Sequence, residues 1–115
     1  MPTRSNKKTK KKKTKKQKMI VHQIFFNIGK GELHEIPRFY KCYKNNKSKC
    51  QKRGIQYKLW SRNMVEKLLD RKENKEYKKL YYDFSQDIMR IDFARYLILY
   101  RFGGIYIDLD ICMMN

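Results

Sequence analysis

The segment from Asp92 to Asp110 constrains the fold of this chain more than any other segment. It begins with an apolar stretch long enough for a helix, is interrupted by Gly103-Gly104, and continues into a short apolar stretch that predicts a β-strand. Charged side chains are rare among buried apolar ones unless they are paired or hold a ligand. The candidate functional residues are therefore Asp92 and Arg95 in the helix and Asp108 and Asp110 in the strand.

The rest of the chain alternates between strand and helix signals, which predicts an α/β protein with a parallel sheet. In such sheets ligands bind beyond the carboxyl ends of the strands, so the loop after Phe26, the end at Trp60 and the acid pair should share one edge. The expected strands are 19–26, 55–60 and 105–109, and the expected helices are 37–53, 62–71, 77–84 and 86–102.

The acid pair follows the expected third strand with a spacing of two residues. Residues two apart in a strand face the same side, which predicts Ile105, Ile107 and Leu109 toward the core and both aspartates on the opposite side. Their side chains would be about 7 Å apart. One ion could therefore reach both only if the backbone turns at Asp110 or if one acid binds through water. Mn²⁺ or Mg²⁺ suits carboxylates combined with a phosphate. The plain alternative is two solvated acids, or acids that cap a following helix.

Asp92 and Arg95 are three residues apart on the expected helix and can touch. A simple ion pair is one interpretation. The other is that both side chains reach a ligand, because arginine suits phosphate or sugar oxygens and aspartate suits sugar hydroxyls.

The cysteines predict no disulfide framework and no zinc site, because three widely spaced residues do not match either pattern. We expect Cys42, Cys50 and Cys112 to be small, partly buried thiols in a reducing compartment. The chain shows no secretory signal and no run long enough to cross a bilayer, which favours a cytoplasmic location. The lysine- and asparagine-rich helix at 37–53 is expected to be exposed.

The first 18 residues hold 10 of the 29 lysine and arginine residues and none of the acids. With almost no apolar side chains, this segment cannot offset its ordering entropy, so we expect a disordered tail ahead of one domain at 19–115. A nuclear address, a contact for nucleic acid and a contact for anionic lipid all fit such a tail, as does a merely solubilising polycation.

Taken together, these residues resemble the sugar-binding-region glycosyltransferases that carry a DXD motif. That group includes fungal Golgi α-mannosyltransferases and is related to the glucosylating bacterial toxins. The resemblance rests on Val21-His22-Gln23-Ile24-Phe25, Tyr57-Lys58-Leu59-Trp60, Asp92-x-x-Arg95, Tyr100 and Gly103-Gly104-x-Tyr106-x-Asp108-x-Asp110.

The resemblance implies a GT-A fold, which is a Rossmann-like nucleotide-sugar-binding sheet. It also implies transfer of a sugar from a nucleotide-sugar donor to a glycan or protein acceptor, with retention and with help from Mn²⁺ or Mg²⁺. By the same resemblance, Asp110 would bind the metal, and Asp108 would contact both the metal and the donor. Asp92 and Arg95 would hold the donor sugar, and Phe25 would lie against the nucleotide base. No residue is identified as catalytic.

Members of this family continue well past the position of Asn115, where this sequence stops. We therefore expect only the N-terminal, donor-binding half of the fold, as a fragment, a degenerate product or one half of a complex completed by another chain. The alternative function is a non-catalytic remnant whose basic tail binds nucleic acid or an anionic surface.

Overall fold

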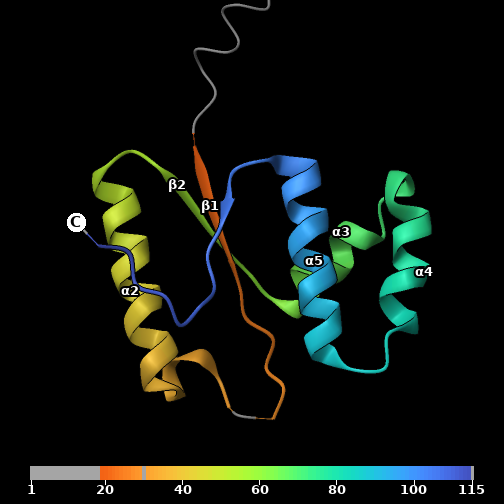
Figure 1. Ribbon diagram of the computed structural model, residues 1–115, viewed down its shortest axis with the longest axis horizontal. Helices are drawn as coiled ribbons and strands as arrows, with labels where there is room; N and C mark the ends of the chain where they lie inside the picture. The colour runs from red at the N-terminus through yellow and green to blue at the C-terminus, as the bar shows by residue number, and fades with distance from the viewer. Residues whose placement is uncertain (1–18, 30, 115) are drawn as a thin grey trace, which may run out of the picture.

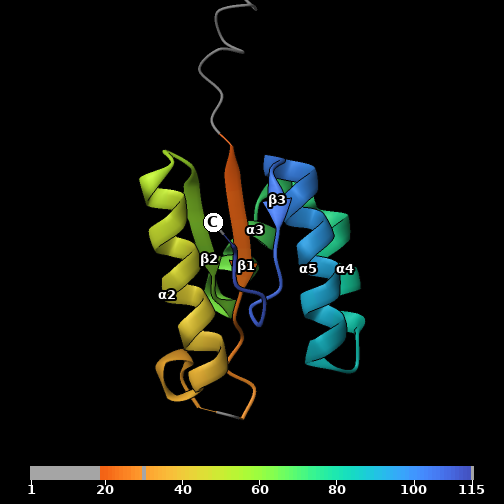
Figure 2. The ribbon, with the colours of Figure 1, turned by 60° about the vertical axis from the view of Figure 1, so that its left-hand side comes forward.

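The computed structural model describes residues 19–29 and 31–114, and the basic tail lies outside these described residues. Three parallel strands form a sheet in the order β2-β1-β3. Helix α2 lies on one side of this sheet, and α3, α4 and α5 lie on the other (Figures 1 and 2). The predicted α/β class with a parallel sheet is confirmed. The elements are β1 (Ile20–Ile24), η1 (Leu33–Glu35), α2 (Pro37–Lys52), β2 (Gln56–Trp60), α3 (Arg62–Leu69), η2 (Lys72–Asn74), α4 (Lys75–Asp83), α5 (Asp87–Phe102) and β3 (Ile105–Tyr106).

The central strand β1 is buried on both faces, as expected for an apolar strand that has a neighbour on each side. Its Ile24 belongs to the main apolar core, which includes Trp60 of β2, Val65 of α3 and Ile98 of α5. Helix α3 begins where the sequence predicts it, because the Ser61 side chain caps the first turn by accepting a hydrogen bond from the backbone of Met64.

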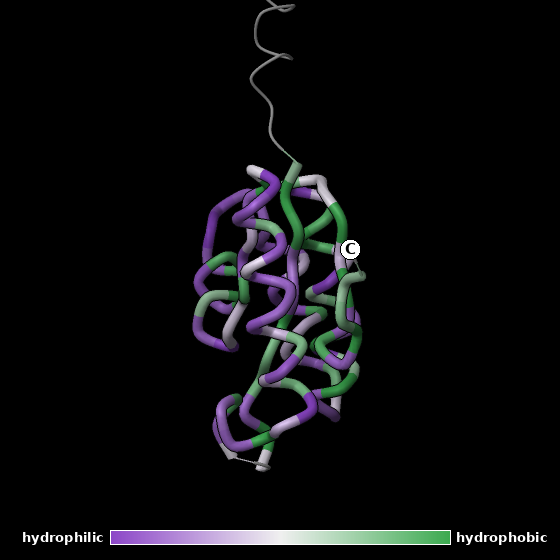
Figure 3. Tube along the Cα trace, turned by 90° about the vertical axis from the view of Figure 1, so that its left-hand side faces the viewer, coloured by the Kyte–Doolittle hydropathy of each residue, from purple (hydrophilic) through white to green (hydrophobic). Residues whose placement is uncertain are grey.

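Helix α2 is less exposed than its composition suggests. Hydrophilic residues predominate along it (Figure 3), but Cys42, Asn46 and Cys50 are buried. These three residues are spaced four apart, so they form one stripe along the helix that faces the rest of the protein. The expectation of an exposed helix is therefore wrong for this stripe.

The third strand is shorter than predicted, and its first residue faces the other way, whereas Leu109 is buried as expected. It ends at Tyr106 instead of Leu109, and Ile105 is 46% exposed. Tyr106 pairs with His22 of β1 and packs against the core beside α5. The expected inward direction of Ile105 is wrong because the pairing with β1 puts Tyr106, not Ile105, on the face that α5 covers.

The double glycine after α5 meets two separate steric requirements. Gly103 ends the helix with a φ of 68°, and Gly104 follows with a φ of 93°, both in a range that side-chain-bearing residues rarely adopt. A side chain at Gly104 would also collide with the Ile20 carbonyl oxygen of β1, whereas the space around Gly103 is open. Gly104 therefore allows β3 to lie directly against β1.

Alanine substitutions at the two glycines should separate these requirements. Gly103→Ala should lower the free energy of unfolding by about 1–3 kcal/mol, through backbone strain alone. Gly104→Ala should add about 1–3 kcal/mol to such a loss, because the new methyl group overlaps β1. Urea denaturation of both variants measures the difference. Equal losses would contradict the close approach of Gly104 to β1.

Candidate functional site

The two aspartates of the DXD pattern lie on a turn that follows β3. The backbone N–H of Ile111 donates to the carbonyl of Asp108 at 3.0 Å, which closes a turn over Asp108, Leu109 and Asp110. Both carboxylates are solvent-accessible, with side-chain exposures of 57% and 41%. The backbone therefore turns at the acid pair and does not continue as an extended strand.

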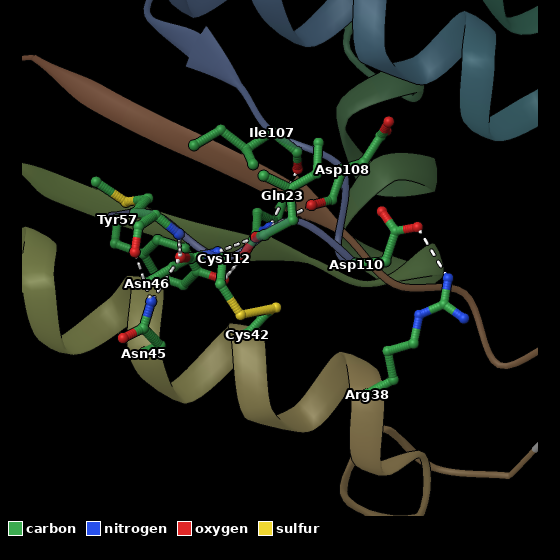
Figure 4. Close-up of a disulfide and its surroundings, with 12 residues drawn as sticks. Gln23, Arg38, Cys42, Asn45, Asn46, Tyr57, Ile107, Asp108, Asp110 and Cys112 are labelled. Atoms are coloured by element: carbon green, nitrogen blue, oxygen red, sulfur yellow. Dashed lines mark hydrogen bonds and ion pairs between the residues drawn. A yellow bond between two sulfur atoms is a disulfide. The ribbon is translucent and has the colours of Figure 1, made fainter. Parts of the chain in front are cut away.

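Each of these carboxylates has an arginine near it. Arg38 of α2 donates to Asp110 at 3.2 Å (Figure 4), and the Arg95 Nη1 atom of α5 lies 3.8 Å from Asp108. Arg95 also donates to Asp92 at 2.6 Å, so the expected ion pair forms and extends to the acid turn. The structure thus brings together Asp92, Arg95 and Asp108, while Asp110 lies toward α2.

Arg95 is the most constrained of these charged groups. Its guanidinium lies 5.2 Å from the ring centroid of Tyr106, and its Nε atom is buried with no hydrogen-bond partner in the described part of the chain. Burial, followed by the negative charge of Asp108, raises the pKa of Tyr106 to about 12. Near neutral pH the tyrosine therefore stays a neutral neighbour of both charged groups.

An open hollow of about 610 Å³ adjoins this group. Its charged lining comes from Arg95 and Asp108, and the remainder is mostly apolar. The apolar part comprises Leu99, Tyr106, Ile107, Ile111, Met113 and Met114. The hollow can hold a ligand that offers oxygen atoms to its charged side and carbon atoms to the rest.

Phe25 lies apart from Arg95, at a second hollow of about 240 Å³. This hollow is apolar, with Phe26, Phe39, Ile91 and Leu109 in its lining. Phe25 is half-buried there, immediately beyond the carboxyl end of β1. Leu109 lines this second hollow while Asp108 lines the first, so the acid turn lies between them.

The structure contradicts the expected cysteine chemistry. Cys42 of α2 and Cys112 form a disulfide across a sequence separation of 70 residues (Figure 4). Cys50 is a buried free cysteine. The expectation of unpaired thiols in a reducing compartment is therefore wrong for two of the three, because an odd count does not exclude one bridge between residues that the fold brings together. Burial raises the pKa of the Cys50 thiol, which keeps it protonated.

Sequence reasoning also missed the part that α2 plays in this site. Arg38 contacts Asp110, Cys42 is bonded to Cys112, and Asn46 contacts Ile111. The available signal was the four-residue spacing of Arg38, Cys42, Asn46 and Cys50, which puts them on one face of a helix. Their partners are the last aspartate of the DXD pattern and residues just beyond it, and no spacing rule links the two segments.

His22 is a buried structural residue of β1. Its Nδ1 atom accepts a hydrogen bond from the Trp60 indole at 3.1 Å, so the proton lies on Nε2, which donates to the Gly103 carbonyl at 2.9 Å. Burial lowers the pKa of His22 despite the raising effect of the bond to Gly103. His22 is therefore a satisfied histidine of the strand, and Trp60 packs in the core.

Two absences apply to residues 19–29 and 31–114. No cluster of three or more histidine, cysteine, aspartate or glutamate side chains gathers there as a complete metal cage. No helix in the same ranges has the length and apolar character needed to cross a membrane.

The acid turn lies beyond the carboxyl end of β3, at the edge where α/β proteins with parallel sheets generally bind their ligands. The particular family follows from comparison with known proteins. The family model "Glycosyltransferase sugar-binding region containing DXD motif" matches residues 35–115. The chain therefore belongs to this glycosyltransferase family.

Two curated relatives extend the comparison. An uncharacterized glycosyltransferase of Acanthamoeba polyphaga mimivirus is 31% identical over 98 residues, which cover 84% of this chain and 37% of the viral protein. Inositol phosphoceramide mannosyltransferase 1 of Schizosaccharomyces pombe is 30% identical over 97 residues, which cover 70% of this chain and 30% of the yeast protein. The chain thus spans about a third of the length of these relatives. No solved structure matches it significantly.

The environment of His22 predicts how stability depends on pH. As the pH falls below about 6.5, the unfolded chain binds a proton at this residue, while the folded chain stays neutral until its lower pKa is reached. Acidification from pH 7.5 to 5.5 should therefore lower the free energy of unfolding by up to about 1 kcal/mol through this group. Urea denaturation at both pH values measures the loss. His22→Gln should show a smaller dependence on pH, and an unchanged dependence would contradict the assignment.

Proposed function

We propose that this chain is the donor-binding part of a glycosyltransferase that transfers a hexosyl group from a nucleotide-sugar to a glycan or protein acceptor. The observation that carries the proposal is the acid turn itself, with Asp108 exposed beside Arg95 and Asp110 exposed beside Arg38 at the carboxyl edge of the sheet. Retention of the anomeric configuration is proposed from the family resemblance. The two flanking hollows support a ligand with distinct polar and apolar parts.

The residues of the turn fit a divalent cation of the Mg²⁺ or Mn²⁺ type. Such ions are commonly held by one or two carboxylates together with substrate phosphates, and they do not need a complete protein cage. Asp110 and Asp108 would supply the two carboxylates. When bound, the cation would offset the negative charge of the donor diphosphate and stabilise it as a leaving group.

Arg95 and Asp92 are proposed to hold the donor on the other side of the turn. The buried Nε–H of Arg95 has no acceptor in the described chain, and an unsatisfied buried donor of this kind is unfavourable. The Arg95 side chain is 28% exposed and lines the larger hollow, so its Nη atoms can donate to a ligand oxygen there. Asp92 holds the guanidinium in place through its 2.6 Å contact and has a second oxygen available for a sugar hydroxyl.

Phe25 is proposed to contact the nucleotide base at the smaller hollow. The hollow is apolar, and an aromatic ring on its wall can stack against a flat heterocycle. Because Leu109 of the acid turn lines the same hollow, a base held there would lie next to the diphosphate site.

Arg38 adds a competing interaction at Asp110. Its side chain is 72% exposed and contacts the carboxylate that would bind the cation. An exposed ion pair stabilises by only about 0.2–1 kcal/mol, so a divalent ion can displace the arginine at small cost. Arg38 should therefore weaken cation binding slightly without preventing it.

Substitutions of Asp110 and Arg38 test the proposal by measuring how tightly the chain binds Mn²⁺. The 115-residue chain should bind Mn²⁺, and it should bind members of a panel of UDP- and GDP-sugars only when Mn²⁺ is present. Asp110→Asn should weaken Mn²⁺ binding about 10-fold or more, because it removes a charged oxygen ligand. Arg38→Gln should strengthen it about 1.5- to 5-fold, since the competing ion pair is lost. Titration calorimetry measures both affinities.

The matched control is Lys78→Gln, which removes one positive charge from an exposed ion pair with Asp70 elsewhere on the surface. If Lys78→Gln strengthened Mn²⁺ binding as much as Arg38→Gln, the effect would be one of net charge and not of competition at Asp110. Absence of Mn²⁺ binding to the unmodified chain, or full binding by Asp110→Asn, would overturn the proposed function.

A further inference from the structure

The backbone leaves the sheet after the Ile107 N–H, which donates to the His22 carbonyl of β1, and two of its carbonyl groups at this point are held by one buried side chain. Gln23 of β1 is fully buried, and its amide group donates to the carbonyls of Ile107 at 3.2 Å and Asp108 at 3.0 Å. These two bonds take the place of strand pairing at the point where the acid turn begins (Figure 4).

A second buried amide holds the other end of the turn. Asn46 of α2 is fully buried, and its Nδ2 atom donates to the Ile111 carbonyl at 2.9 Å. Its Oδ1 atom accepts from the Met113 backbone N–H at 2.7 Å. The same Nδ2 atom also donates to the Gln23 Oε1 atom at 3.3 Å, so the two amides are joined (Figure 4).

The hydroxyl group of Tyr57 completes this network from β2. It donates to the Gln23 Oε1 atom at 2.7 Å, and burial raises the pKa of Tyr57, which keeps it a donor. Gln23 thus uses both of its amide hydrogens and accepts two hydrogen bonds. A fully satisfied buried polar network of this kind fixes one arrangement of the groups it connects, because any displacement leaves a buried polar atom unpaired.

We propose that Gln23 and Asn46 are positioning residues for the acid turn, and that they set its affinity for a divalent cation. The proposal rests on the proposed function, since it assigns cation binding to Asp108 and Asp110. Neither amide contacts the carboxylate groups themselves. They hold the backbone at Ile107, Asp108, Ile111 and Met113, on both sides of Asp110, and so determine where the two carboxylates project.

The disulfide does not replace this network. It joins Cys42 to Cys112 and therefore fixes one position after the turn. The start of the turn at Asp108 depends on Gln23, because its carbonyl accepts from that amide. Loss of the amides should therefore leave the segment attached to α2 but free to vary the spacing of its carboxylates.

The experiment compares Mn²⁺ affinity among variants of the 115-residue chain without reductant, so that the disulfide is retained. Gln23→Leu and Asn46→Leu replace each amide with an apolar side chain of similar size and so remove the hydrogen bonds. Each should weaken Mn²⁺ binding about 10-fold or more, as substitutions of groups that orient metal ligands commonly do. Tyr57→Phe, the milder variant, removes one hydroxyl group and should weaken binding about 2- to 5-fold while leaving the fold intact.

The matched control is Asn74→Leu. Asn74 is also fully buried, but its amide donates to the Leu68 carbonyl and accepts from Arg101, away from the acid turn. Circular dichroism and urea denaturation establish that every variant compared is folded at the assay temperature. Asn74→Leu should lose stability yet bind Mn²⁺ within about twofold of the unmodified chain.

Hydrogen exchange at the Met113 amide provides a second measurement that needs no metal. Its N–H donates to Asn46, and Asn46 in turn donates to Gln23. The Met113 amide should therefore exchange at least 10-fold faster in Gln23→Leu and Asn46→Leu, and at an unchanged rate in Asn74→Leu. Unchanged exchange and unchanged Mn²⁺ affinity in the Gln23, Asn46 and Tyr57 variants would overturn the positioning role while leaving the proposed function standing. Absence of Mn²⁺ binding to the unmodified chain would overturn the proposed function and this inference together.

Discussion

Residues 108–113 lie beyond the last hydrogen bond of the sheet, which the Ile107 backbone N–H donates to the His22 carbonyl of β1. Their backbone polar groups must therefore find partners other than a neighbouring strand. Gln23 and Asn46 supply them from two different elements, one in the central strand and one in α2. Everything distinctive about the candidate site follows from this constraint. The acid turn, the hollow beside Arg95 and the disulfide all involve the segment that these two amides hold in place.

The same constraint explains why a polar helix is packed against the sheet. Most of α2 is hydrophilic, and it supplies few apolar side chains to a core. Its buried stripe instead contributes the Asn46 amide and the Cys42 disulfide. Hydrogen bonds and a disulfide require particular partners in a particular orientation, whereas apolar packing does not. The helix therefore fixes one conformation of the segment that carries Asp110. An apolar helix face would allow several.

The charged groups of the site are arranged so that each acid has a cationic neighbour. Arg38 contacts Asp110, while Arg95 lies between Asp92 and Asp108. These exposed pairs are individually weak, so a ligand that brings both a cation and anionic oxygens can exchange with them. This arrangement is consistent with the proposed donor site and with membership of the DXD glycosyltransferase family.

The sequence by itself determined the α/β class, the order of the elements, the cap at Ser61 and the break at Gly103-Gly104, because these depend on local periodicity and backbone sterics. It also singled out the acids and Arg95 as candidates for the site, since charges among apolar residues are conspicuous. Only the tertiary structure decided that the strand ends at Tyr106, that Cys42 meets Cys112, and that Gln23 and Asn46 hold the turn. These outcomes depend on contacts between residues up to 85 positions apart, and no local pattern specifies which distant groups will meet.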